Sequence, residues 1–291
     1  MSDMIFQRIR WKCRRLSIPV DRNSLVLEVG SGGNPYPRAN VLCDAYEDTR
    51  ERFWSPLTSD RPTVIAFGED LPFKDKSFDY VIAAHVLEHT PYPERFLAEL
   101  QRVARSGYIE TPDAFMERIN PYRDHRLEVT LRNDYLSIRK KPAWIYDTEL
   151  VELYEHRAKQ YISKVLIPRW PYDFHLRYYW KDVINFHVVN PEVDASWTPE
   201  ASDPRVEIAG SFSFRFRLSL RLLLLKCLRL VFSQSYRNRH IDLVTLLRCT
   251  NCHSGDLAKS ADHLICKSCG FEYKFSKGVL TMKAHNIGLK K

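Results

Sequence analysis

The 291-residue sequence predicts an α/β fold, in which a doubly wound, mostly parallel sheet is followed by a small metal-stabilised module. Between residues 24 and 110, short apolar runs ending in a glycine or an acid alternate with a helical pattern, which is typical of a parallel sheet. Four of the seven cysteines form two Cys-x-x-Cys pairs near the C-terminus, which predicts a separate metal site.

The expected strands cover residues 24–30, 40–43, 64–67, 78–84 and 107–110. Residues 93–105 predict an amphipathic helix, because Pro93 suits a first turn and Phe96, Leu97 and Leu100 share one face. Residues 111–180 show no clean period, and two strand-like segments follow at 183–189 and 212–220. The aromatic-rich residues 170–180 line an acceptor pocket or belong to the core, and the sequence leaves both readings open.

The formal net charge of +8 is concentrated in one segment. Residues 211–248 hold eight Lys and Arg against the single acid Asp242, so this segment carries +7 and the remainder about +1. A basic catalytic face for nucleic acid is therefore not indicated. Residues 221–232 predict a basic apolar helix with three readings: packing between the two parts of the chain with its cations in solvent, membrane-surface binding, or nucleic-acid contact.

The expected location is cytoplasmic. The N-terminus lacks the uninterrupted apolar stretch of a secretory signal, and no run reaches the roughly 18 apolar residues of a membrane span. The cysteine pattern indicates an intracellular metal site more than a disulfide framework.

A glycine turn follows the first expected strand and is the first sign of a nucleotide-type site. Glycines at 30 and 32 let backbone N–H groups approach a polar ligand, because no side chain intervenes. Asp44, at the end of the second strand, can accept hydrogen bonds from ribose hydroxyls. Alone, this pattern also fits a structural turn or a dinucleotide site.

Further motifs narrow the choice. Residues 66–73, 77–79 and 81–89 (VIAAHVLEH) follow in order, and residues 22–115 as a whole resemble the class I S-adenosylmethionine-dependent methyltransferases of the small-molecule type. The resemblance implies that the cofactor is bound by Glu28, Gly30, Ser31, Gly32, Asp44, Phe67, Gly68, Glu69 and His85. In particular, it implies that Glu28 faces the methionyl amino group, Asp44 the ribose, the turn around Gly68 the adenine, and His85 the sulfonium and acceptor.

Two departures from that family are visible. Only 11 residues, including Pro35 and Pro37, separate Gly32 from Asp44, so the usual helix there is expected to be shortened or missing. Phe67 stands where the family often has an aspartate that contacts the adenine amino group, which implies stacking on the base instead.

The expected reaction is methyl transfer to an oxygen or nitrogen, with His85 and His125 as candidate catalytic residues and His89 and His175 as further candidate bases. A capping or packing role competes for His89, and an exposed loop position competes for His125. No (Asp/Asn)-Pro-Pro-Tyr run follows the fourth strand, which favours a small molecule, glycan or lipid-linked acceptor. The alternatives are an RNA- or translation-associated methyltransferase and a non-catalytic interaction module that docks through the metal site.

The cysteine pairs predict a four-thiolate zinc site. Cys249 and Cys252 are followed, after 13 residues, by Cys266 and Cys269, and two such pairs supply the tetrahedral donor set that Zn²⁺ prefers. Residues 241–283 resemble the small zinc-ribbon activator of tRNA and translation-factor methyltransferases, although Thr250 replaces its usual proline. The resemblance implies an activator fused in cis that stabilises the methyltransferase part or shapes its acceptor side, and that offers a surface for a protein partner.

The predicted organisation has four parts. Residues 1–210 form the methyltransferase domain, with its cofactor half at 22–115 and its acceptor region at 111–210. Residues 211–240 connect it to the zinc ribbon at 241–283, and residues 284–291 form a tail.

Overall fold

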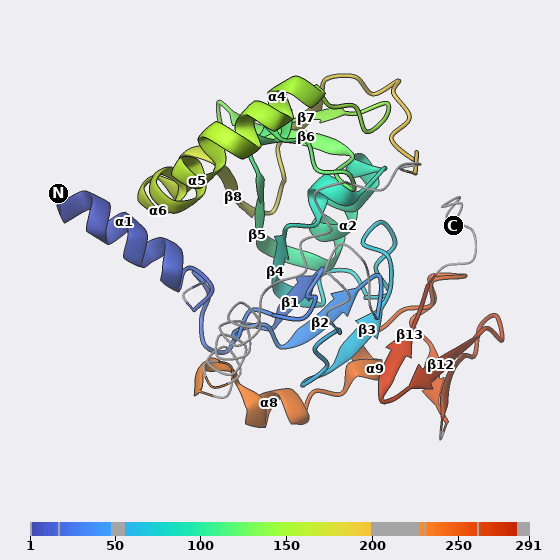
Figure 1. Cartoon of the computed structure of the whole chain (residues 1–291). Coiled ribbons are helices and arrows are strands. Elements are labelled where there is room, and N and C mark those ends of the chain that lie inside the picture. Colours follow the sequence, from blue (N-terminus) through green and yellow to red (C-terminus); the bar gives the residue numbers. More distant parts are fainter. Residues whose placement is uncertain are drawn as a thin grey trace.

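The computed structural model describes residues 2–16, 18–47, 56–198, 227, 229, 231–260 and 262–283 (Figure 1). Its centre is a sheet whose described strands follow the order β10-β11-β12-β13-β3-β2-β1-β4-β5-β8. The parallel strands β1 (Val26–Val29), β2 (Val41–Asp44), β3 (Thr63–Ile65), β4 (Phe78–Ala84) and β5 (Ala104–Pro112) form its middle. The predicted Rossmann-like, mostly parallel sheet is confirmed.

The strands that the apolar runs predict are β1 to β5. Every residue of β1, β2 and β3 is buried, as expected for parallel strands that are covered on both faces. The segment predicted at 183–189 contributes β9 (Phe186–Val188), which joins β6 (Leu127–Arg132) and β7 (Tyr135–Lys140) in a separate three-stranded sheet. The strand predicted at 212–220 lies outside the described residues.

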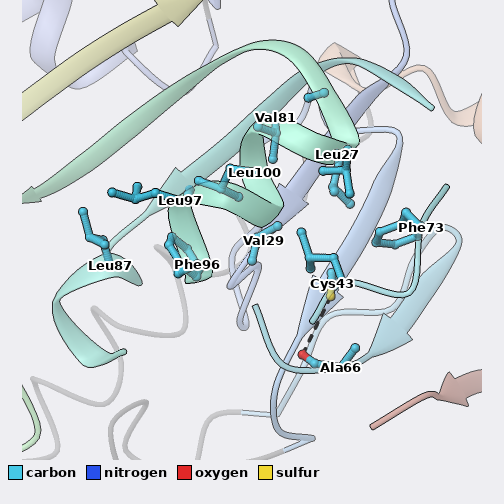
Figure 2. Packing of buried hydrophobic residues seen from close by; sticks show 14 of the residues in the cluster. Leu27, Val29, Cys43, Ala66, Phe73, Val81, Leu87, Phe96, Leu97 and Leu100 are labelled. Carbon is cyan, nitrogen blue, oxygen red and sulfur yellow. Dashed lines mark hydrogen bonds between the residues drawn. The ribbon is translucent and has the colours of Figure 1, made fainter. Parts of the chain in front are cut away.

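The predicted amphipathic helix is α2 (Pro93–Val103). It ends two residues earlier than expected, because Ala104 already belongs to β5. Its apolar face is buried against the parallel sheet, where Figure 2 shows Phe96, Leu97 and Leu100 beside Val29 and Val81. This packing fixes the sheet face on which the turns after β3 and β4 lie.

Several elements carry no clear period in the sequence. They are α1 (Ser2–Cys13), α3 (Ala114–Ile119) and a helical stretch made of α4 (Thr148–Leu153), η3 (Tyr154–Ala158), α5 (Lys159–Tyr161), η4 (Ile162–Leu166) and α6 (Ile167–Arg169). Shorter turns are η2 (Leu87–His89) and η5 (Pro171–Asp173). Strand β8 (His175–Lys181) is antiparallel to β5 at the sheet edge, and α1 contacts α6 and η5.

The cysteine-rich part is joined to the central sheet (Figure 1). After α8 (Ser235–Arg239) and α9 (Leu243–Leu246), the antiparallel strands β10 (Leu257–Lys259), β11 (His263–Cys266), β12 (Glu272–Ser276) and β13 (Val279–Thr281) form the ribbon. Strand β13 then pairs in parallel with β3, placing Leu280 opposite Val64. The Met282 N–H extends this ladder by donating to the Ile65 carbonyl at 2.8 Å.

A second contact anchors the ribbon on the loop after β3. Leu247 forms an antiparallel bridge with Phe73, and the Arg248 N–H donates to the Pro72 carbonyl at 3.0 Å. Leu247, Leu280 and Met282 are buried in the same apolar cluster as Val64. Because the ribbon shares sheet and core with the preceding part, the division into independent domains stays a prediction.

Most of the predicted basic helix at 221–232 lies outside the described residues. Arg229, which is described, does not extend into solvent. Its Nε lies 3.7 Å from a carboxylate oxygen of Asp60, and its side chain is only 15% exposed. Within the described part of the chain, no helix combines the length and the apolar character needed to cross a membrane.

Truncating Leu280 tests whether ribbon and sheet unfold together. All six tryptophans precede residue 198, so tryptophan fluorescence reports only on the part before the ribbon. Because Leu280 is 1% exposed, we expect Leu280→Ala to lower the free energy of unfolding in urea by about 2–5 kcal/mol on this signal.

The control is Leu131→Ala, whose side chain is 42% exposed and whose effect we expect to stay within about 0.5 kcal/mol. An unchanged tryptophan transition in Leu280→Ala would show that the ribbon folds independently.

Candidate active site and metal centres

The glycine turn lies at the carboxyl end of β1 and has a strict steric requirement. Gly30 and Gly32 have φ values of 72° and 57°, in the left-handed region that favours glycine. A Cβ on Gly30 would lie 2.0 Å from Cγ2 of Val86, which follows β4. A substitution at Gly30 would therefore disturb folding before it reported on a ligand. Turns and bends occupy residues 31–40, so the expected loss of the usual helix is confirmed.

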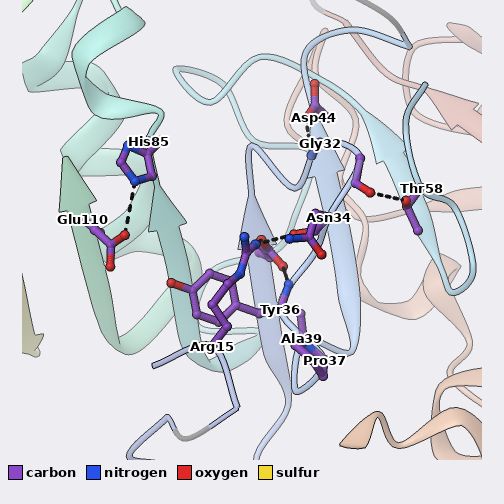
Figure 3. A network of polar contacts seen from close by, with 12 residues as sticks. Arg15, Gly32, Asn34, Tyr36, Pro37, Ala39, Asp44, Thr58, His85 and Glu110 are labelled. Atoms are coloured by element: carbon purple, nitrogen blue, oxygen red, sulfur yellow. Dashed lines mark hydrogen bonds and ion pairs between the residues drawn. The ribbon is translucent and has the colours of Figure 1, made fainter. Parts of the chain in front are cut away.

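Asp44, at the end of β2, holds the glycine turn in place (Figure 3). Its Oδ2 accepts from the Gly32 N–H at 2.8 Å, and its Oδ1 accepts from the Tyr46 N–H at 3.0 Å. On the other side of the turn, the Thr58 hydroxyl donates to the Gly33 carbonyl at 2.9 Å. The Ser31 hydroxyl oxygen is buried and forms no hydrogen bond within the described structure. Such an orphaned polar atom is expected where a ligand completes the site.

Glu28 points from β1 into the same end of the sheet and is 2% exposed. Its Oε2 accepts from the Tyr36 N–H at 2.7 Å, and Nη2 of Arg15 lies 3.9 Å from Oε1. Burial raises the pKa of Glu28 to about 7, and the nearby Arg15 only partly offsets this effect. The carboxylate would gain from a positively charged ligand group at this position.

The turn after β3 carries Phe67, Gly68 and Glu69. The Phe67 ring meets Tyr46 edge-on at 6.3 Å, and Nζ of Lys283 lies 5.1 Å from its centroid. A Cβ on Gly68 would lie 2.5 Å from the Phe96 ring, so close packing of α2 accounts for this glycine. Lys283 comes from the end of the ribbon, and its position depends on the β3–β13 pairing, which no local sequence signal reveals.

Glu69 is buried and accepts a short hydrogen bond from the Thr90 hydroxyl. Burial raises the pKa of its carboxyl group, because only this hydrogen bond and more distant arginines favour the charged form. The structure therefore places Glu69 between the turn after β3 and the turn after β4. A cofactor contact for it stays a prediction.

His85 follows β4 directly and has a positive φ of 58°. Its Nε2 lies 3.1 Å from Oε1 of Glu110, on β5, and its Nδ1 lies 3.4 Å from Oε1 of Glu88 (Figure 3). Glu110 also binds Arg14 Nε at 3.2 Å and the Tyr108 hydroxyl. Burial alone lowers the pKa of His85, but the two carboxylates outweigh it and raise the pKa to about 9.

An aromatic group lies beside His85. The ring of His175, at the start of β8, is 5.9 Å from that of His85 and 4.7 Å from that of Trp11 on α1. Leu176, Tyr178 and Trp180 of the same strand are buried in the core. The aromatic-rich stretch therefore contributes to both the core and the site, because alternate residues of a strand face opposite ways.

His125 is not an exposed loop histidine. It is 8% exposed, and its Nδ1 lies 2.7 Å from Oε2 of Glu117, on α3. His89, in η2, has its Nδ1 3.1 Å from the Asp124 carbonyl oxygen, and its ring meets the His125 ring at 4.7 Å and 90°. Glu117 and Glu88, which organise these histidines, are absent from the residues predicted from sequence, because their positions depend on tertiary contacts.

The four ribbon cysteines converge. Potential ligand atoms of Cys249, Cys252, Cys266 and Cys269 all lie within 4.8 Å of one another. The Cys249–Cys269 and Cys252–Cys266 sulfur separations are 3.7 and 3.5 Å, close to the roughly 3.8 Å edge of a tetrahedron with 2.3 Å zinc–sulfur bonds. The Asn251 N–H points to the Cys249 sulfur at 3.3 Å, as expected around a metal-bound thiolate.

Comparison with known proteins agrees with the fold. Residues 27–109, from β1 into β5, match the family model described as a methyltransferase domain. This span contains every residue predicted to bind the cofactor. The chain therefore contains a class I methyltransferase domain.

Individual relatives are distant or short. An uncharacterized protein of Methanocaldococcus jannaschii is 46% identical over 44 residues, which are 15% of this chain and 22% of that protein. The chain thus matches about a fifth of the length of this curated relative.

Two solved structures are similar to parts of the chain. The first is a chain from the complex between the Haloferax volcanii Trm112 methyltransferase activator and a protein described as a methyltransferase. Its TM-score is 0.36 at 16% identity, with 64% of this chain and 94% of that chain covered. The second, an S-adenosylmethionine-dependent methyltransferase from Thermotoga maritima, has a TM-score of 0.29 at 19% identity, with 39% and 55% covered.

Proposed function

We propose that the chain is an S-adenosylmethionine-dependent methyltransferase that acts on an oxygen or nitrogen of a small molecule, a glycan or a lipid-linked intermediate. The observation that carries this proposal is the convergence of three features at one sheet edge. The left-handed glycine turn, the Asp44 carboxylate and the buried Glu28 carboxylate all lie at the carboxyl ends of β1 and β2. Ligands of open parallel sheets bind at this edge.

The chemistry of the residues fits the parts of the cofactor. The Glu28 carboxylate would receive the methionyl amino group, whose positive charge offsets the cost of burying it. Asp44 would accept from the ribose hydroxyls, and Phe67 would stack against the adenine beside Lys283. The backbone at Gly30 and Gly32 and the unpartnered Ser31 hydroxyl would line the path between them.

S-adenosylmethionine, when bound, supplies a methyl group already activated on a sulfonium, so this chain has to align the acceptor and receive its proton. Of the two histidines beside the end of β4, His175 suits proton transfer better. Its Nδ1 lies 3.2 Å from the Pro171 carbonyl oxygen, which leaves Nε2 as an acceptor. Burial and the neighbouring His85 lower the pKa of His175, which favours the neutral ring.

The acceptor side is partly aromatic. Trp11, His175 and His85 lie close together there, and Arg14 stacks over Trp11 at 3.6 Å. Aromatic and cationic groups suit a sugar or another polar small molecule. The ribbon, tied to β3 next to this site, would hold zinc through its four cysteines and act as a stabilising activator in cis.

The first test of the cofactor site is Glu28→Gln. The amide keeps the shape of the side chain and the hydrogen bond from the Tyr36 N–H, but removes the charge that faces the amino group. We expect a roughly 10- to 100-fold weaker dissociation constant for S-adenosylmethionine by calorimetric titration, the equivalent of about 1.5–3 kcal/mol for a hydrogen bond to a charged group.

Glu128→Gln is the matched control, because this carboxylate lies on β6 and pairs with Arg118. Wild-type affinity in Glu28→Gln would remove Glu28 from the site. Absence of binding by folded, zinc-replete wild-type protein would contradict the methyltransferase proposal and favour a non-catalytic interaction module.

Cofactor binding is also expected to release a proton from Glu28. With a pKa of about 7, the free carboxyl group is mostly protonated at pH 6.5, whereas pairing with an ammonium group requires the charged form. Affinity should therefore rise with pH between about 5.5 and 7, because fewer protein molecules then have to lose this proton.

Calorimetry at pH 6.5 in buffers of different ionisation enthalpy measures this released proton directly. The signal should be absent in Glu28→Gln. Equal proton release by wild type and Glu28→Gln would assign the proton to another group.

The zinc proposal is tested with Cys266→Ser. Cys266 is fully buried and its sulfur faces that of Cys252, so the change should remove one zinc per chain by elemental analysis. It should also lower the tryptophan-monitored stability by several kcal/mol, because metal binding and folding of a ribbon this small are coupled. Cys13→Ser, at an exposed cysteine, should change neither quantity. Retained zinc in Cys266→Ser would contradict the four-thiolate site.

A further inference from the structure

A second group of metal-ligating side chains lies apart from the ribbon, beside the end of β4. Glu88, His89 and His125 each present a ligand atom within 4.8 Å of the other two. We propose that these three residues bind one divalent first-row transition-metal cation through the Glu88 carboxylate and the Nε2 atoms of His89 and His125. Two imidazoles and one carboxylate form a known donor set for such ions and leave further coordination positions open.

Hydrogen bonds to the Nδ1 atoms orient both histidines for metal binding. Nδ1 of His89 lies 3.1 Å from the Asp124 carbonyl oxygen, and Nδ1 of His125 lies 2.7 Å from a Glu117 carboxylate oxygen. A carbonyl and a carboxylate can only accept, so both Nδ1 atoms carry the proton and both Nε2 atoms keep a lone pair. This is the tautomer, held by an outer partner, that metal-ligating histidines adopt.

Glu88 supplies the second, independent observation. Its side chain is 2% exposed, and within the described structure neither of its carboxylate oxygens has a hydrogen-bond partner. His85 Nδ1 approaches one of them only to 3.4 Å. A buried carboxylate without hydrogen bonds is costly, and a bound cation is one of the few arrangements that offset this cost.

The surroundings hold the cluster in place. Glu117 also accepts from Lys141 Nζ at 2.7 Å and from the Tyr122 N–H at 3.1 Å, so it is fixed as an ionised partner behind His125. The Arg126 N–H donates to the Glu88 carbonyl at 2.7 Å, which ties the segment carrying His125 to the turn carrying Glu88. The ligands therefore come from two loops that are joined by backbone contact.

The position of the cluster gives the cation a role in the proposed function, on which this step rests. Glu88 lies beside His85, which is placed at the sulfonium and acceptor end of the cofactor site. A cation with open positions could bind an acceptor oxygen and lower its pKa. This arrangement favours a hydroxyl acceptor over an amine.

The probe is Mn²⁺, followed by the loss of the free-ion electron paramagnetic resonance signal as it binds the full-length, zinc-replete chain. Thiolates prefer zinc to Mn²⁺, so the ribbon should not compete. We expect one Mn²⁺ per wild-type chain and at least tenfold weaker binding in both Glu88→Gln and His125→Asn. Mn²⁺ should also raise the melting temperature of the wild type, but not of Glu88→Gln.

The controls are Glu128→Gln and His187→Gln, which alter a carboxylate and a histidine on β6 and β9 and should bind Mn²⁺ as the wild type does. A folded wild type that takes up no Mn²⁺, or variants that bind it unchanged, would overturn the metal site.

Titration of Glu88→Gln with S-adenosylmethionine separates the two proposals. Wild-type cofactor affinity with lost Mn²⁺ binding supports the metal site as a separate ligand set. Mn²⁺ binding by a wild type that takes up no cofactor would keep the metal site and contradict the methyltransferase function.

Discussion

The contact between Val86 and the bare Cα of Gly30 is the constraint on which the candidate site depends. Any side chain at Gly30 would displace Val86, since an added Cβ would lie 2.0 Å from its Cγ2. Val86 separates His85 from η2, which carries Glu88 and His89. The close approach therefore sets the glycine turn, the end of β4 and the histidine cluster in one fixed arrangement. Packing at one residue aligns the cofactor edge with the acceptor edge.

The second organising feature is the closure of the sheet edge by the ribbon. Strand β3 has only three residues, and without β13 one side of it would present unpaired backbone groups to solvent. Pairing with β13 satisfies these groups and buries Leu280 and Met282 in the common core. The same connection brings Lys283 to the aromatic rings of Phe67 and Tyr46. Ribbon stability and the geometry of the cofactor edge are thereby linked.

Local patterns predicted the parts of the molecule that local physics determines. Buried parallel strands are apolar on both faces, so β1 to β5 could be read from short runs, and α2 from its single apolar face. The cysteine pairs were readable because chain spacing alone brings such thiolates together. Asp44 was found because it ends a strand beside the glycine turn, and the structure confirms that it contacts Gly32.

The acceptor side could not be predicted in the same way. Strand β8 reaches β5 from almost 70 residues away and brings His175 beside His85, a pairing that has no sequence period. Glu88 and Glu117 are ordinary glutamates until the fold buries them next to histidines from other segments. The pairing of β13 with β3 is similarly invisible, because a three-residue strand does not specify its partner.

The β3–β13 ladder also has a consequence for biosynthesis. Ile65 pairs with Thr281, so the two halves of the ladder are separated by more than 200 residues along the chain. At about 5–20 residues per second, the ribosome would make β13 roughly 10–40 s after β3. During that interval β3 has no partner on one side and depends on chaperones or on chance to avoid another edge strand. Such a long-range parallel pairing also forms slowly, so the cofactor edge is among the last parts of the protein to mature.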